Sequence, residues 1–211
     1  MHDAATTLTK VVRETVTDRV ELPKIVMAWQ SPRHFAPGDA DLDLLASILA
    51  TGKASRLYHA LVYEQKLAQS VEATEESGAV GSRFVIGVVA RPGVSLEKLE
   101  AGIDKELERL RKSKVTDEEL SRAENGVETG FVSRLQSVRA RASLLNDYQT
   151  ELGDPGYAQK DLDRYRKATA ADLLATASRV LRADAHVVLR VVPAPPQPPQ
   201  PQGAAPKEGE S

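Results

Sequence analysis

The order in which strand-like and helix-like segments follow one another restricts the fold of this chain more than any other feature. Alternating or β-branched apolar residues predict strands at 19–31, 69–76, 82–91 and 185–192. Helical spacing of apolar residues predicts helices over 39–50, from 53 to about 61, over 96–110, over 116–145, around 162–165 and over 169–181. This order matches a split β-α-β-β-α-β plan. The fold class is therefore α+β, with an antiparallel sheet and helices packed mainly on one face.

The first predicted strand is apolar on both of its faces. Ile25, Met27 and Trp29 point to one side of such a strand, and Val26 and Ala28 point to the other. This pattern is typical of a strand that is covered on both sides.

The predicted helix over 116–145 combines a clear start signal with two weak points. Thr116 and Glu119 have the spacing of a capping box, in which each side chain bonds the backbone amide of the other residue. Gly126 and Gly130 lie inside this helix, where glycine costs about 1 kcal/mol relative to alanine. We interpret them as close-packing points or a bend. The apolar stripe of this helix consists of Leu120, Ala123, Val127, Phe131, Val138, Ala142 and Leu145.

The two ends of the chain differ in composition from its body. From Pro193 onward the sequence reads PAPPQPPQPQGAAPKEGES, with no apolar side chain larger than alanine or proline. Such a segment cannot bury enough surface to offset its ordering entropy. We expect 193–211 to be a Pro-rich linker or tail, the alternative being a PxxP-type ligand for an aromatic groove. Residues 1–10 are expected to be a disordered lead, which leaves a single domain over 11–192.

Composition and charge exclude several classes of protein. The 211 residues include no cysteine, which rules out a disulfide scaffold, a thiol nucleophile and a thiolate metal site. The net charge of −2 creates no field that would attract nucleic acid, so we expect no nucleic-acid partner. We find no run of about 18 apolar residues and no signal-peptide pattern, and therefore expect no membrane span.

The histidines and acids show no pattern of a catalytic or metal site. No two histidines have the i, i+4 spacing with an intervening glutamate that a helical zinc site needs. We expect His34 in a solvated loop, and His59 and His186 at the surface or at an edge. Neither a serine elbow nor a carboxylate pair placed for acid–base work is found. From residue chemistry alone we expect no catalytic residue, metal or cofactor in this chain.

One stretch resembles a known family. Residues 51–58 (TGKASRLY) and 67–71 (LAQSV) resemble the pattern G-x-S-S-R-L … L-R-E … G-L-A-Y-S-V of the non-catalytic domains of insulinase/pitrilysin-type zinc metallopeptidases, a group that includes mitochondrial processing peptidase. The resemblance extends over almost everything from residue 11 to 193. It includes segments at 22–29, 117–125, 153–155 and 187–193, in the order that the family has.

The resemblance implies a clamshell of two similar halves that close around a peptide substrate. Zinc is then expected on an H-x-x-E-H helix of a catalytic partner domain, in cis or in trans, while a domain of the present kind supplies one wall of the chamber. Active members hold the substrate backbone with an arginine and a tyrosine, and the matching positions here are Val62 and Gln69. The candidate substrate-binding residues are Arg56 and Tyr63, which are polar and nearby, and Gln69, which retains an amide donor and acceptor.

Two other functions stay open at the level of the sequence. The loss of both substrate-holding residues favours a structural or assembly subunit of the same fold with no proteolytic role. An unrelated split α+β ligand-binding domain would require the extended match to be chance. The resemblance to exported bacterial members places the protein in the periplasm or cell envelope, with the cytoplasm as the alternative.

Overall fold

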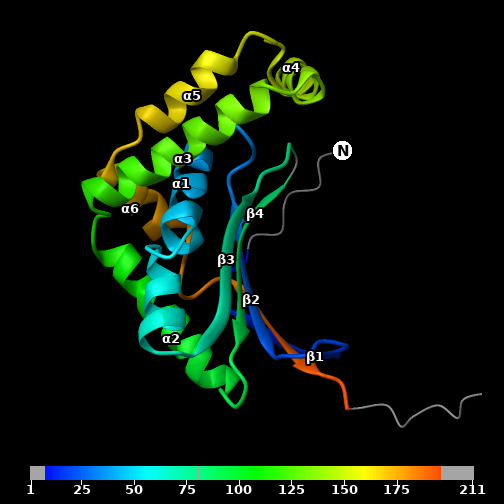
Figure 1. The fold of residues 1–211 in the computed structure, drawn as a ribbon, viewed down its shortest axis with the longest axis vertical. Coiled ribbons are helices and arrows are strands. Elements are labelled where there is room, and N and C mark those ends of the chain that lie inside the picture. Colours follow the sequence, from blue (N-terminus) through cyan, green and yellow to red (C-terminus); the bar gives the residue numbers. More distant parts are fainter. Residues whose placement is uncertain (1–7, 80, 196–211) are drawn as a thin grey trace, which may run out of the picture.

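A five-stranded sheet lies at the centre of the computed structural model, which describes residues 8–79 and 81–195. Its strands stand in the order β1-β5-β2-β4-β3. Strand β1 runs parallel to β5, and all other neighbours are antiparallel (Figure 1). The strands are β1 (Val12–Asp18), β2 (Lys24–Ser31), β3 (Ala68–Glu76), β4 (Ser82–Ala90) and β5 (Val187–Pro193).

The described residues form seven helical segments where six helices were predicted, in the predicted order, and the α+β fold class is confirmed. Helices α1, α2 and α6 pack on one face of the sheet, while α3, α4 and α5 extend beyond its end and form what we call the helical arm (Figure 1). The segments are α1 (Asp39–Ala50), the π-helix η1 (Tyr58–Glu64), α2 (Leu96–Lys112), α3 (Asp117–Leu135), α4 (Val138–Leu152), α5 (Ala158–Arg166) and α6 (Ala170–Val180).

Strand β1 was not predicted from the sequence. Its residues, VRETVTD, are mostly exposed, because the strand lies at the edge of the sheet and pairs only with β5. An exposed edge strand leaves no alternation of apolar and polar residues for sequence reasoning to detect. Residues 19–23, which we predicted as the start of the first strand, instead form the turn between β1 and β2.

The core lies between the sheet and α1, α2 and α6. Ile25, Met27 and Trp29 of β2 are at most 2% exposed and pack with apolar residues of these helices. The Trp29 indole N–H donates a hydrogen bond to the carbonyl of Arg182 at 2.9 Å, and its ring stacks on His186 at 5.0 Å between centroids. The prediction that His186 lies at the surface or at an edge is wrong: it is 3% exposed and comes just before β5, which is not an edge strand, and burial lowers its pKa. His186 belongs to the core because its ring stacks on that of Trp29.

The helix predicted over 116–145 is two helices. The Thr116–Glu119 capping box is present, but α3 ends at Leu135, and Ser137 caps α4 by accepting a hydrogen bond from the Ala140 amide at 3.3 Å. The predicted apolar stripe does not continue on one buried face across this break. Val138 and Leu145, which belong to that stripe, are 73% and 50% exposed.

The two glycines of α3 are not close-packing points and do not interrupt the helix. A Cβ atom added at Gly126 or Gly130 would meet no atom within 4 Å, and α3 continues through both positions. Both lie on the exposed side of the helix. They therefore weaken α3 without a packing reason.

We predict that Gly126→Ala and Gly130→Ala each raise the free energy of unfolding by about 1 kcal/mol, because alanine loses less backbone entropy in a helix. Urea denaturation of the full chain measures this. Gly153→Ala is the matched control: it also has free space, but its φ of 67° at the end of α4 favours glycine. It should lower stability, by about 1 kcal/mol. If the two α3 substitutions lowered stability, this would contradict the interpretation that Gly126 and Gly130 have no packing role.

Candidate functional site

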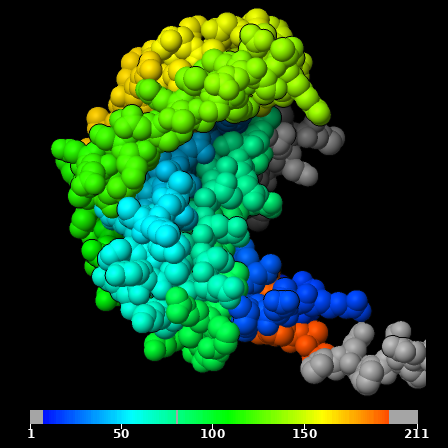
Figure 2. Space-filling view, in the orientation of Figure 1, coloured from blue at the N-terminus to red at the C-terminus, as the bar shows by residue number. Residues whose placement is uncertain are grey.

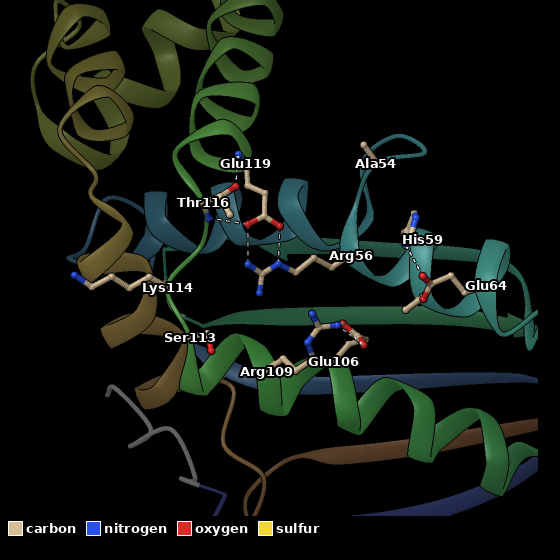
Figure 3. A pocket seen from close by; sticks show the side chains of 11 residues that line it. Ala54, Arg56, His59, Glu64, Glu106, Arg109, Ser113, Lys114, Thr116 and Glu119 are labelled. Atoms are coloured by element: carbon tan, nitrogen blue, oxygen red, sulfur yellow. Dashed lines mark hydrogen bonds and ion pairs between the residues drawn. The ribbon is translucent and has the colours of Figure 1, made fainter.

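A polar pocket of about 500 Å³ opens where η1, the end of α2 and the start of α3 meet (Figure 3). It contains one of the three residues that the sequence singled out, Arg56. The other charged residues in its wall are His59, Glu64, Glu106, Arg109, Lys114 and Glu119.

The Arg56 side chain is engaged within the protein. Its Nε and Nη2 atoms donate to the two carboxylate oxygens of Glu119, each at 2.7 Å (Figure 3). Glu119 Oε2 also accepts from the Thr116 amide at 2.8 Å, as the capping box requires. The guanidinium lowers the pKa of Glu119, and the carboxylate raises that of Arg56. Arg56 thus joins the segment before η1 to the first turn of α3.

The remaining charges of the pocket are also largely paired. The Glu106 side chain is 4% exposed and receives hydrogen bonds from Arg109 Nη1 at 3.1 and 3.2 Å. His59 lies 3.5 Å from Glu64. Arg56 and Glu119 thus form one ion pair of the pocket and Arg109 and Glu106 another, whereas for Lys114 the described part of the chain shows none. The pocket is suited to bind a polar group rather than to activate a nucleophile.

The structure does not bring Arg56, Tyr63 and Gln69 into one pocket. Tyr63 is 70% exposed, and its ring lies 5.6 Å from that of His59 between centroids. Gln69 is the extra residue of a β-bulge on edge strand β3, beside a shallow depression that also contains Lys24. Val62 is 8% exposed and part of the core.

One face of the sheet has no helix over it in the described part of the chain. We call it the open face; on it lie half-buried apolar residues of the central strands, Val26 and Ala28 of β2 and Val85 and Val89 of β4. Figure 2 shows that the molecule is a crescent, hollowed between the helical arm and the ends of β1 and β5, with β3 and β4 in the hollow. The apolar pattern of β2 predicted that both faces of this strand are covered. In the described part of the chain, helices cover only one of them.

A second polar cluster is buried where the helical arm meets the body. Asp39, at the start of α1, is 0% exposed. Its Oδ2 accepts from Arg164 of α5 at 3.0 Å, and its Oδ1 accepts from Ser77 of the β3–β4 turn at 2.6 Å. The Phe35 amide also donates to Oδ2, at 3.0 Å, and this supports the left-handed backbone of Phe35, whose φ is 61°.

Two further carboxyl groups beside Asp39 have raised pKa values. Burial raises the pKa of Asp43 to about 6, against the hydrogen bond that the Tyr165 hydroxyl donates to it at 2.7 Å. Burial and the neighbouring acids raise the pKa of Glu75 to about 7, against the hydrogen bond from Ser31. Glu75 Oε2 is buried without a hydrogen-bond partner. Sequence reasoning missed this cluster because its members come from four distant segments.

Among the described residues, no three His, Cys, Asp or Glu side chains lie so that they could hold a metal ion. None of the helices in the described ranges is both long and apolar enough to cross a bilayer.

Comparison with known proteins shows which family the chain is similar to. A family model described as the peptidase M16 inactive domain matches residues 2–127. The zinc protease PqqE of Helicobacter pylori is 29% identical over 131 residues, which are 62% of this chain and 30% of that protein. The chain thus spans less than a third of the length of this curated relative.

Solved structures show the same fold. The inactive peptidase domain of a Bordetella parapertussis protein is 26% identical, with a TM-score of 0.76, and the match covers 89% of this chain and 98% of that one. A protease from Helicobacter pylori has a TM-score of 0.80 at 22% identity, over 88% of this chain and 44% of that one. The second likeness supports the fold alone.

We predict that Arg56 and Glu119 are energetically coupled. A double-mutant cycle with Arg56→Ala and Glu119→Ala, measured by urea denaturation, should give a coupling of about 2 kcal/mol, because each single change leaves a half-buried charge unpaired. Arg122 and Glu118 are the matched control, since they form an exposed pair at 3.9 Å and should couple by less than about 0.5 kcal/mol. An equally small coupling for Arg56 would show that it is free for a ligand.

We predict that stability falls as the pH rises from about 5 to 8. The folded state holds a proton on Glu75 up to a pKa of about 7, whereas the unfolded chain releases it near 4.5. The stabilisation by this proton is thus complete below pH 4.5 and is lost as the pH rises through 7. The free energy of unfolding should fall by about 3 kcal/mol over this range. Denaturation at several pH values should show a smaller decline for Glu75→Gln. The control Glu118→Gln should leave the decline unchanged, because that side chain is 90% exposed and is not among the acids that raise the pKa of Glu75.

Proposed function

The chain belongs to the family of inactive M16 peptidase domains of zinc protease-like proteins, and from this premise we propose that it forms one wall of a peptide-binding chamber. The zinc chemistry is supplied by a catalytic H-x-x-E-H domain, in cis or in trans. The proposal assigns no catalytic residue to this chain. Its task is to bind and orient an extended peptide.

The open face is the observation that carries this proposal. Its central residues, Val26, Ala28, Val85 and Val89, are apolar and only half-buried, and the molecule is hollow on that side (Figure 2). A patch of partly exposed apolar side chains on one face suits the packing of another chain or a ligand. The match to only 30% of the Helicobacter pylori zinc protease PqqE agrees with a second part that faces this wall.

The geometry of the open face suits an extended peptide. Side chains of neighbouring strands alternate there, with Ala28 opposite Val85 and Val85 opposite Thr74. These small side chains form the centre of the open face, and Glu72 and Gln30 add polar groups beside them. An extended chain of alternating side chains can lie across such a surface and bury every second residue.

The three candidate residues, Arg56, Tyr63 and Gln69, have different roles in the proposed function. Tyr63 and Gln69 are exposed and available for a peptide. Arg56 is a positioning residue, because its guanidinium is bound to Glu119 and holds η1 against α3. We also propose the periplasm or cell envelope as the compartment, following the exported members that the resemblance implies, with the cytoplasm as the alternative.

A structural or assembly subunit without a proteolytic role is the second candidate function. One observation favours it: Val62, at the position of the family's substrate-holding arginine, is a core residue and offers a peptide no side-chain hydrogen bond. A subunit of this kind would use the open face for a partner protein instead of a peptide.

Ala28→Trp tests the chamber in the protein that contains the H-x-x-E-H domain, whether that domain is fused to this chain or is a separate subunit. An indole on the open face should lower kcat/KM for a peptide substrate at least tenfold, because it fills the surface on which the peptide lies. Lys105→Trp, on the exposed side of α2, is the control and should leave hydrolysis unchanged. Unchanged hydrolysis in Ala28→Trp would exclude the peptide wall. Loss of assembly, with no peptidase activity in the parent complex, would establish the structural subunit.

A further inference from the structure

The end of the helical arm carries an unusual concentration of exposed apolar side chains. Five of the seven large hydrophobic residues that are exposed in the described chain lie on α3, α4 or the turn between them. Four of them surround the α3–α4 turn, and we call this set the arm ridge: Val132, Leu135, Val138 and Leu145, with exposures of 57%, 36%, 73% and 50%.

Unpaired positive charge accompanies the arm ridge. The segment 129–146 contains Arg134, Arg139 and Arg141 and no acid, in a chain whose net charge is −2. None of the three guanidinium groups has an ion pair or a side-chain hydrogen bond in the described structure. The other arginines of the helical arm are paired, as Arg164 is with Asp39 and Arg166 with Glu128.

The helix that carries much of the arm ridge is held firmly on its other side. Leu144 and Tyr148 are 7% and 1% exposed, and the Tyr148 hydroxyl donates to Asp161 of α5 at 2.8 Å. The Tyr148 ring also packs with Phe35 and Tyr157, at 5.9 and 5.7 Å between centroids. The exposed residues therefore belong to an ordered helix pair and not to a loose loop.

We propose that the arm ridge binds the surface of a membrane that contains anionic phospholipid. An apolar face flanked by basic residues is the pattern of helices that lie in the membrane interface. A guanidinium without a carboxylate partner matches a lipid phosphate in charge and in bidentate geometry. The helical arm forms the far end of the molecule from β1 and β5, so its helices can reach a flat surface without the sheet in the way (Figures 1 and 2).

A lipid surface fits these observations better than an acidic protein partner does. The end of the arm forms one tip of the crescent (Figure 2), and a protein would have to offer a groove shaped for it. Fluid lipid accommodates four protruding side chains in any arrangement, and the arginine stems can extend from the apolar level to the headgroups. The proposal is independent of the chamber, because the arm ridge and the open face share no residue.

Cosedimentation of the full chain with vesicles tests the proposal. Binding is expected to vesicles of 30% phosphatidylglycerol in phosphatidylcholine, to be absent with phosphatidylcholine alone, and to weaken at 0.5 M NaCl. The triple variant R134Q/R139Q/R141Q should bind about 100-fold more weakly, given about fivefold for each arginine. Val138→Ser combined with Leu145→Ser should also reduce binding, without loss of the native circular dichroism spectrum.

A matched variant separates this surface from total charge. The variant R19Q/K53Q/K98Q removes three exposed cations that lie outside the helical arm and should bind vesicles as the parent does. Equal binding by the two triple variants would overturn the proposal. Binding to an acidic amphipathic helical peptide but not to the vesicles would also overturn it, and would identify the arm ridge as a protein interface. Neither result bears on peptide hydrolysis, which tests the chamber separately.

Discussion

The fully buried carboxylate of Asp39 connects the parts of this molecule. It binds Arg164 of the helical arm, Ser77 of the β3–β4 turn and the amide of Phe35, all from the start of α1. A buried charge of this kind is tolerated only when its lone pairs are satisfied. The direction of the arm, and with it the crescent shape, therefore depends on an ion pair between residues that are 125 positions apart in the sequence. Burial at the same place is the main cause of the raised pKa values of Asp43 and Glu75, and the neighbouring Asp39 adds to it.

Unequal cover of the sheet is the feature that links the fold to its function. The helices bury one face of β2 and β4, and the face that they leave open is still apolar. In an isolated domain this surface would lower solubility, whereas in the proposed chamber it would be the binding surface. The family of the chain and its match to only 30% of a longer relative support that proposal.

Sequence reasoning succeeded where a signal was local and periodic. It predicted β2, β3, β4 and β5, helices α1 and α2, and the capping box of α3. It failed at β1, which is exposed and lacks alternation, and at the break between α3 and α4, where apolar spacing continues although the helix ends. It also misplaced His186, because a histidine that stacks on a buried tryptophan has no distinctive neighbours in the sequence.

By itself the sequence determined the α+β class, the family resemblance and the apolar character of β2 on both faces, since each depends on residue types at short spacing. Only the tertiary structure decided what those residues do. It bound Arg56 to Glu119, placed Gln69 on a bulge away from the pocket, and left Val138 and Leu145 exposed beside unpaired arginines. The physical reason is that side-chain partners, burial and charge neighbours come from segments that meet only when the chain folds, and no periodicity records which segments meet.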